Sequence, residues 1–138
     1  MDDSIVLAAK MESLDKAVDF IVKGASKLKF SDKDISQIRL AAEEIVVNII
    51  NYAYPEKAGD MRISYRTEDN NTLVVEIVDS GIAFNPLSLP EPDVNAPLDK
   101  RKIGGLGVYL VKKIMDDVNY ERKDGRNILV FTKTAKNS

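Results

Sequence analysis

Hydrophobic and polar residues alternate along the chain with two different periods, and the changes between them outline the predicted elements. Residues 4–10 form a short apolar run, which predicts an opening strand with one free edge. After Ser13, a suitable N-cap, apolar positions recur at helical spacing over residues 14–28. A longer helix is predicted from Ser31 to about Tyr54, because the next residue is a proline.

The second half of the chain is predicted to form two hairpins. Residues 61–67 and 72–79 alternate in polarity on either side of the turn signal Glu-Asp-Asn-Asn. Residues 118–123 and 128–133 show the same pattern around an Asp-Gly turn. A further helix precedes the second hairpin, since helical periodicity returns after Gly-Gly-Leu-Gly at residues 104–107.

The predicted order is therefore strand, helix, helix, two strands, helix, two strands. A layer of about three helices on one face of a mixed, mainly antiparallel sheet would bury the apolar side of every element. We accordingly predict an α+β fold, a two-layer sandwich. The length of 138 residues suits a single domain spanning residues 1–138.

Composition narrows the classes of function. Apolar residues make up 44% of the chain and charged residues 30%, as in soluble globular proteins. The net charge of -2 supplies no positive field for nucleic acid or for an anionic membrane, so we expect neither as a direct partner. No apolar window has the length of a membrane span and the N-terminus is acidic, so we expect a cytoplasmic protein.

The chain contains no cysteine and no histidine. This excludes disulfides, thiolate zinc sites, nucleophiles activated by imidazole, and phosphohistidine. Chemistry is left to carboxylates, amides, hydroxyls, cationic side chains and the backbone.

The long helix carries a narrow polar stripe. At about 100° per residue, Glu44, Asn48, Asn51 and Gln37 fall on one line with aliphatic residues on both sides. One interpretation is a hydrated surface or an internally paired group. The other is a ligand, since polar groups among aliphatic neighbours need a partner, and a magnesium–nucleotide complex would supply it.

Two further segments contain residue types that commonly contact ligands. Asp79 ends an apolar strand and Gly81 follows it, so a carboxylate could accept a hydrogen bond from the exocyclic amine of a base lying close to the backbone. Asp-Ser-Gly is also a common turn. Residues 104–107, Gly-Gly-Leu-Gly, open a helix and present backbone N–H groups suited to an anion, although an ordinary glycine turn would look the same.

The order of these segments resembles that of the GHKL, or Bergerat-fold, ATPases. Residues 42–54, Ala-Glu-Glu-Ile-Val-Val-Asn-Ile-Ile-Asn-Tyr-Ala-Tyr, resemble the N box. Residues 79–86, Asp-Ser-Gly-Ile-Ala-Phe-Asn-Pro, resemble the first glycine box, and residues 103–110, Ile-Gly-Gly-Leu-Gly-Val-Tyr-Leu, the second. Within that superfamily the chain is most similar to the RsbW-like anti-sigma-factor serine kinases.

The resemblance implies that the protein uses ATP, ADP and Mg²⁺. By position, Asn48 would ligate Mg²⁺ and Glu44 would be the general base toward an attacking serine hydroxyl. Asp79 would receive the adenine amine, with Gly81 giving the base room. The full implied set of nucleotide contacts is Asn48, Asn51, Asp79, Gly81, Ala83, Phe84, Lys102, Gly104, Gly105, Leu106, Gly107 and Val108.

The resemblance also implies an ATP lid at about residues 85–103, with Arg101 and Lys102 placed to neutralise phosphate charge at its end. The chain departs from the family pattern at two positions. Ala83 stands where many members have a second glycine, which fits the kinase branch. The turn at Gly125 lacks the threonine that often follows it, so either Asn127 or water would take over that hydrogen bond.

For partners, the resemblance implies a homodimer, a sigma factor or analogous regulator that is held inactive, and a STAS-domain antagonist that is phosphorylated on serine. Two alternatives remain open. One is a nucleotide-dependent binding module without kinase activity, and the other is the same kinase with a target other than a sigma factor.

Overall fold

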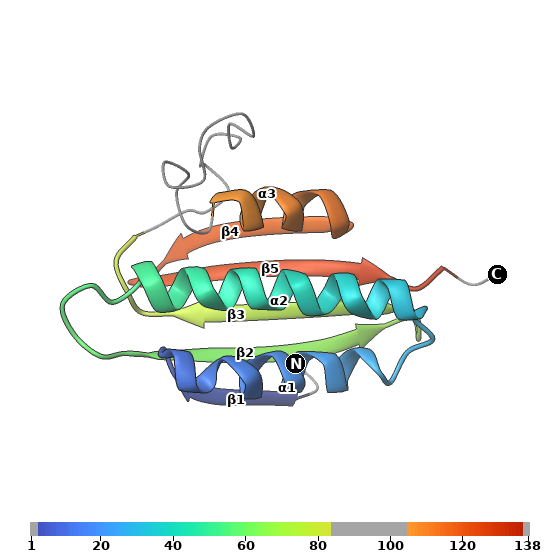
Figure 1. The fold of residues 1–138 in the computed structure, drawn as a ribbon, viewed down its shortest axis with the longest axis horizontal. Helices are drawn as coiled ribbons and strands as arrows, with labels where there is room; N and C mark the ends of the chain where they lie inside the picture. Colours follow the sequence, from blue (N-terminus) through green and yellow to red (C-terminus); the bar gives the residue numbers. More distant parts are fainter. Residues whose placement is uncertain (1–2, 84–104, 137–138) are drawn as a thin grey trace.

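The computed structural model describes residues 3–83 and 105–136. The elements follow the predicted order and confirm the α+β class (Figure 1). They are β1 (Asp3–Ala8), the 3-10 helix η1 (Met11–Ser13), α1 (Leu14–Ala25), α2 (Asp32–Tyr52), β2 (Asp60–Glu68), β3 (Thr72–Asp79), α3 (Gly105–Ile114), β4 (Asp117–Lys123) and β5 (Arg126–Thr134).

The five strands form one sheet in the order β1-β2-β3-β5-β4. All four pairings in this sheet are antiparallel, so the prediction of a mixed sheet is wrong. The physical reason is the position of β5. Strands β3 and β4 run in the same direction, but β5 lies between them and is antiparallel to both, so the two never pair. β1 is an edge strand, as predicted.

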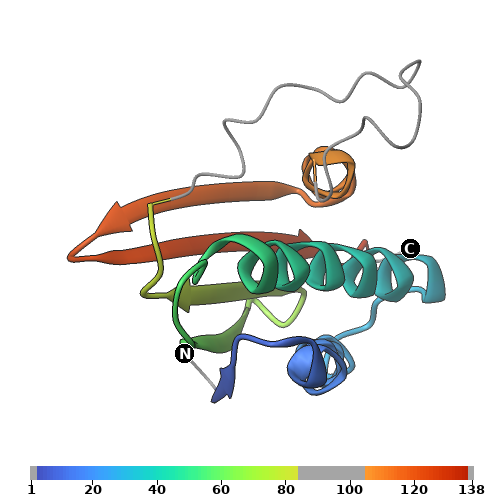
Figure 2. The ribbon, with the colours of Figure 1, turned by 60° about the vertical axis from the view of Figure 1, so that its left-hand side comes forward.

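All three α-helices cover one face of the sheet (Figures 1 and 2). The core lies between this helical layer and the sheet. Ile21 of α1 and Ile38 of α2 are fully buried there, together with Ile63 of β2 and Phe131 of β5. Burial of one face of each element is the packing that the two periodicities predicted.

A side-chain cap marks the start of α2 but not that of α1. Ser31 caps α2, because its Oγ accepts a hydrogen bond from the backbone N of Asp34 at 3.1 Å. Ser13 precedes α1 as predicted but makes no side-chain cap; its backbone N instead donates to the Lys10 carbonyl at 2.9 Å, closing η1. α1 ends at Ala25, three residues before the predicted end.

Helix α2 is 21 residues long and crosses the sheet from one end to the other (Figure 1). Its last turns lie near the end of β3 and the start of β5, which is where the candidate site forms. In the part of the chain that the structure describes, no helix is long and apolar enough to cross a membrane.

Candidate functional site

A hollow lies between the second half of α2 and the three strands β3, β4 and β5. Its cavity volume is about 30 Å³, and together with the adjoining space that is open to solvent the hollow amounts to about 400 Å³. Its walls are mostly apolar, with a few polar side chains that converge on it, an arrangement typical of small-molecule sites. The lining residues are Ile45, Asn48, Ile49, Ala53, Ile77, Asp79, Tyr120, Asn127 and Leu129.

Asn48 is the least satisfied polar residue of this wall. Its side chain is 3% exposed, and neither Oδ1 nor Nδ2 has a hydrogen-bond partner among the described residues. A buried polar group without a partner costs about 1–3 kcal/mol of stability. Among the described residues, neither a hydrated surface nor an internal pair describes Asn48, which is what the ligand interpretation predicts.

Asp79 lies at the last position of β3 and is also buried. Its Oδ1 accepts two hydrogen bonds, from the backbone N of Gly81 at 2.9 Å and from Nδ2 of Asn127 at 2.8 Å. Asn127 lies directly opposite Asp79 in the β3–β5 pairing, which explains the second bond. Since both bonds go to Oδ1, the other oxygen of the carboxylate keeps its lone pairs for a ligand.

Gly81 occupies a position where no side chain fits. A Cβ added there would lie 2.1 Å from the carbonyl oxygen of Ala53, at the end of α2. The next residue, Ile82, donates its backbone N–H to that same oxygen at 2.9 Å. The glycine is therefore required by the backbone of α2, against which the turn after β3 packs directly.

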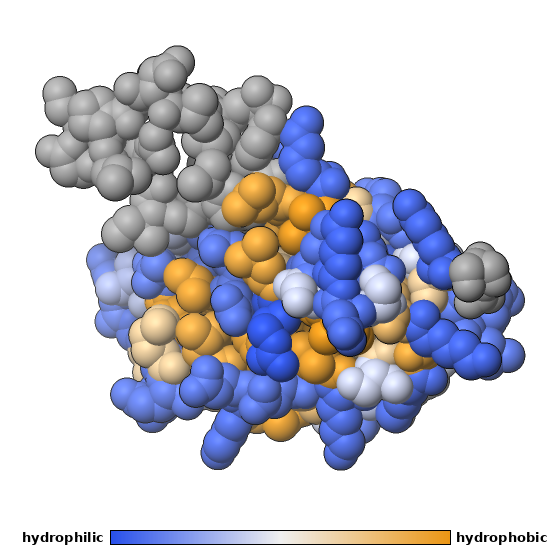
Figure 3. All heavy atoms as spheres, turned by 45° about the vertical axis from the view of Figure 1, so that its right-hand side comes forward, coloured by the Kyte–Doolittle hydropathy of each residue, from blue (hydrophilic) through white to orange (hydrophobic). Residues whose placement is uncertain are grey.

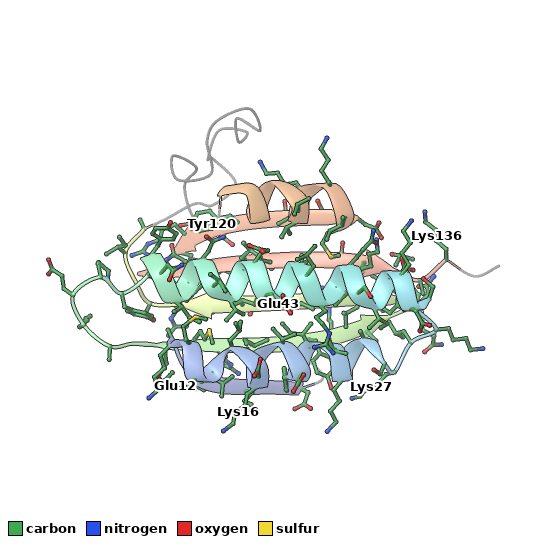
Figure 4. The ribbon with its side chains drawn as sticks, in the orientation of Figure 1. Glu12, Lys16, Lys27, Glu43, Tyr120 and Lys136 are labelled. Atoms are coloured by element: carbon green, nitrogen blue, oxygen red, sulfur yellow. The ribbon has the colours of Figure 1, made fainter. Side chains whose placement is uncertain are left out.

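Glu44 lies one helical turn before Asn48 on α2 and is half-buried. Burial raises the pKa of its carboxyl group, and the neighbouring negative charge of Glu43 raises the pKa further. Glu43 itself points away from the sheet (Figure 4). A glutamate with a raised pKa is better matched to proton transfer near neutral pH than an ordinary one.

Tyr54 holds the turn after β3 from the helical side, a role that the sequence did not reveal. Its hydroxyl accepts from the backbone N of Ser80 at 2.8 Å and donates to the carbonyl oxygen of Asp60 at 2.6 Å. Burial raises the pKa of this hydroxyl. In the sequence, Tyr54 was notable only as the last residue of the motif that resembles the N box.

On β4, Arg122 binds the same turn and Tyr120 binds Asn127, and the sequence revealed neither role. The Tyr120 hydroxyl donates to Oδ1 of Asn127 at 2.5 Å. Nη1 of Arg122 donates to the Gly81 carbonyl at 2.8 Å and to Oδ1 of Asn127 at 3.1 Å. Figure 4 shows Tyr120 on β4, beside the C-terminal end of α2. The available signal was their spacing of two, which places them on one face of a strand.

The structure brings some predicted residues together and separates others. Asn48 and Asp79 line the same hollow, whereas Asn51 is exposed and does not line it. Ala83 is also exposed. The predicted helix start is confirmed; the residues in its first turn are Gly105, Leu106, Gly107 and Val108. Phe84, Lys102, Gly104, Arg101 and the lid at 85–103 lie outside the described residues.

A family model for the histidine kinase-like ATPase domain matches residues 7–133. The chain belongs to this family. The match extends from the first strand to the last and includes every residue that lines the hollow. The histidine kinase-like ATPase domain family is thus established by sequence, in agreement with the three motifs.

Among curated proteins, this family member is similar to serine-protein kinases named RsbW. It is 28% identical to the one from Bacillus mycoides (strain KBAB4) and 29% identical to the one from Bacillus cereus (strain G9842), over 110 residues in each case. The alignments cover 77% of this chain and 68% of each relative. These matches confirm the resemblance to the RsbW-like branch.

Solved structures share the ATPase-domain fold at low sequence identity. The RsbU and RsbW domains of a Mycobacterium tuberculosis protein match with a TM-score of 0.61 and 12% identity, over 96% of this chain. The chain spans 32% of that protein's length. The mycobacterial sensor histidine kinase MprB matches with a TM-score of 0.56 and 13% identity, over the whole of both chains.

Proposed function

We propose that this protein is an ATP-dependent serine protein kinase that acts as an anti-sigma factor in a partner-switching system. The observation that carries the proposal is the buried amide of Asn48, which lacks a partner among the described residues and shares a hollow with the Asp79 carboxylate. A nucleotide with its metal ion would satisfy both groups. The names of the RsbW relatives supply the serine as acceptor.

In this proposal, Asp79 accepts a hydrogen bond from the adenine amine and Asn48 contributes its side-chain oxygen to Mg²⁺. An amide oxygen is a suitable Mg²⁺ ligand, and Mg²⁺ usually takes few ligands from protein and the rest from phosphate and water. In residues 3–83 and 105–136, no group of three or more acidic, histidine or cysteine side chains could hold a metal alone. The phosphates of ATP would therefore complete the coordination.

Glu44 is the proposed general base. The hydroxyl oxygen of the acceptor serine attacks the terminal phosphorus of ATP, the bond from that phosphorus to the bridging oxygen breaks, and Glu44 receives the hydroxyl proton. ADP and phosphoserine are the products. The raised pKa of Glu44 supports this role, because such a carboxylate binds the proton more readily than an ordinary one.

The first turn of α3 is the proposed phosphate contact. Gly105, Leu106 and Gly107 would offer backbone N–H groups at the positive end of the helix dipole. Residues 85–103 would close over the nucleotide, and Lys102 would add positive charge. We propose a sigma factor as the sequestered partner and a STAS-domain antagonist as the phosphorylated one.

The test is a phosphoryl-transfer assay. The purified protein is incubated with labelled ATP and with candidate antagonist proteins encoded near its gene, and any phosphoserine is located by mass spectrometry. We expect label on one antagonist serine with wild-type protein and none with Glu44→Gln, although this variant still binds ATP. Transfer by Glu44→Gln would refute Glu44 as base. ATP binding without transfer to any candidate would favour a binding module.

A further inference from the structure

Asn127 lies at the centre of a polar network next to Asp79, the candidate acceptor for the adenine amine. Its Nδ2 donates to Oδ1 of Asp79 at 2.8 Å and to the carbonyl oxygen of Ile82 at 2.7 Å. Its Oδ1 accepts from the hydroxyl of Tyr120 at 2.5 Å and from Nη1 of Arg122 at 3.1 Å. The residue is 5% exposed, although it is only two positions beyond a surface turn.

The chemistry of these partners fixes the orientation of the amide. A backbone carbonyl can only accept and a guanidinium can only donate, so the amide cannot be turned over without losing bonds at both ends. Both hydrogens of Nδ2 are already used on the protein. Asn127 therefore cannot itself donate a hydrogen bond to a bound base while this network is intact.

The same network determines which oxygen of Asp79 is left for a ligand. Asn127 and the backbone N of Gly81 both donate to Oδ1, which locks the carboxylate and leaves Oδ2 as the available acceptor. Arg122 also donates to the Gly81 carbonyl at 2.8 Å, which connects the turn to the hairpin that carries Tyr120. The β4–β5 hairpin thus fixes the acceptor in one direction.

We propose that Asn127 is a positioning residue for base selection, which orients the Asp79 carboxylate so that a six-amino purine is preferred over a six-keto purine. The inference rests on the proposed role of Asp79 in receiving the adenine amine. An amine donates to a carboxylate oxygen, whereas a keto oxygen is an acceptor and is repelled by it. A carboxylate free to rotate could turn aside and would discriminate less.

The experiment compares the binding of ATP and ITP, in which a keto oxygen replaces the amine, by titration calorimetry with Mg²⁺ present. For Asn127→Ala we expect ATP affinity to fall at least tenfold while ITP affinity changes less than threefold, so that the preference collapses. Arg126→Ala is the matched control, because Arg126 is the exposed neighbour of Asn127 on the same strand. It should change neither affinity by more than twofold.

Tyr120→Phe provides a second variant that keeps the ring in place and removes one donor to Asn127. We expect it to reduce the ATP preference at least threefold with little change in Tm. An unchanged preference in Tyr120→Phe, or in folded Asn127→Ala, would overturn the inference. Because binding is measured without an acceptor protein, failure of serine phosphorylation would leave the inference standing. If the wild type bound neither nucleotide, both proposals would fall.

Discussion

Two asparagines in the site are buried to the same degree but have opposite surroundings. Asn48 has no partner among the described residues for either polar atom, whereas both polar atoms of Asn127 are hydrogen-bonded. Burial without a partner lowers stability, and burial with a full set of partners does not. The free energy of unfolding should therefore respond differently to apolar substitution at the two positions.

We predict that Asn48→Leu leaves the nucleotide-free protein as stable as the wild type or more stable by about 1 kcal/mol, because an isosteric apolar group removes an unsatisfied one. The same change should abolish binding of Mg-ATP. Asn127→Leu is the control and should destabilise the protein by about 2 kcal/mol, since it removes one of the two hydrogen bonds of Asp79 Oδ1 and one of the two of Arg122 Nη1. Urea unfolding measures both values. Equal losses in the two variants would contradict the assignment of Asn48 as a ligand contact.

The pH dependence of transfer should report the pKa of Glu44. A base must be deprotonated, so activity falls as the pH drops through its pKa, and a raised pKa places that fall at higher pH than for an ordinary glutamate. Glu43→Gln removes the second cause of the shift and should move the acid limb of the rate profile to lower pH. Glu12→Gln, on an exposed residue of η1, should leave it in place. If the acid limb of Glu43→Gln lay at the same pH as that of the wild type, the assignment of Glu44 as the base would be contradicted.

Two glycine-to-alanine substitutions distinguish destabilisation by a steric clash from destabilisation by backbone strain. Gly81→Ala forces a Cβ against the Ala53 carbonyl and should cost about 1–3 kcal/mol and weaken nucleotide binding. Gly125 has a positive φ of 77°, and none of the described residues approaches its Cβ position within 4 Å. Gly125→Ala should cost about 1–2 kcal/mol from strain alone and leave binding intact. Thermal melts and nucleotide titrations of both variants would test this, and a loss of binding in Gly125→Ala would contradict it.

At the scale of elements, Lys133 connects α2, α3 and β5. It lies toward the ends of α2 and β5 that are opposite the hollow. Nζ of Lys133 donates to the carbonyl of Ile114, the last residue of α3, at 2.6 Å and to Oε1 of Gln37 at 3.1 Å. It also lies 3.9 Å from the carboxylate of Asp34. A cation at a helix C-terminus is favoured by the helix dipole, so this contact fixes the end of α3.

We predict that Lys133→Met lowers the free energy of unfolding by about 2 kcal/mol, because it leaves a partly buried carbonyl and a partly buried carboxylate without this partner. The side chain of Lys133 is only 12% exposed, so solvent screens this contact little. Lys136→Met is the control, since Lys136 is exposed beyond the end of β5 (Figure 4). Chemical denaturation measures the free energy of unfolding of both variants. Equal values would contradict the stabilising role of the Lys133 contacts with α2 and α3.

The elements themselves were predictable because their ends carry local chemistry. Ser31 and Pro55 bracket α2, and turn residues separate the strands of each hairpin, so most boundaries fell within two residues. The order of strands in the sheet was not predictable in this way. Periodicity states which face of a strand is buried but does not state which strand lies beside it.

The candidate site was predictable to the extent that its residues break a local pattern. Glu44 and Asn48 interrupt an aliphatic helix, and Asp79 ends an aliphatic strand. Tyr120 and Arg122 break no pattern, because a strand at the sheet edge readily carries both types of residue. Their roles depend on the turn at Gly81, which is distant in sequence, and only the fold brings it within reach.

At the scale of the whole molecule, we predict a homodimer, as the family resemblance implies. Hydrophobic residues reach the surface between hydrophilic ones in Figure 3, and Val6, Met11 and Ile82 are more than half exposed among the described residues. Light scattering at micromolar concentration should give twice the chain mass of 15.3 kDa. A monomeric mass would contradict the prediction.

The position of Asn127 near the end of the fold has a consequence for biosynthesis. A chain leaves the ribosome from its N-terminus, so α2 and β3 emerge long before β4 and β5. Until β5 arrives, β3 has an unpaired edge, which is a hazard for aggregation. The Asp79 carboxylate also lacks the amide that locks it until then. A nascent chain would thus acquire its full affinity for ATP only after the last hairpin has folded, and tight nucleotide binding would indicate that synthesis has passed that hairpin.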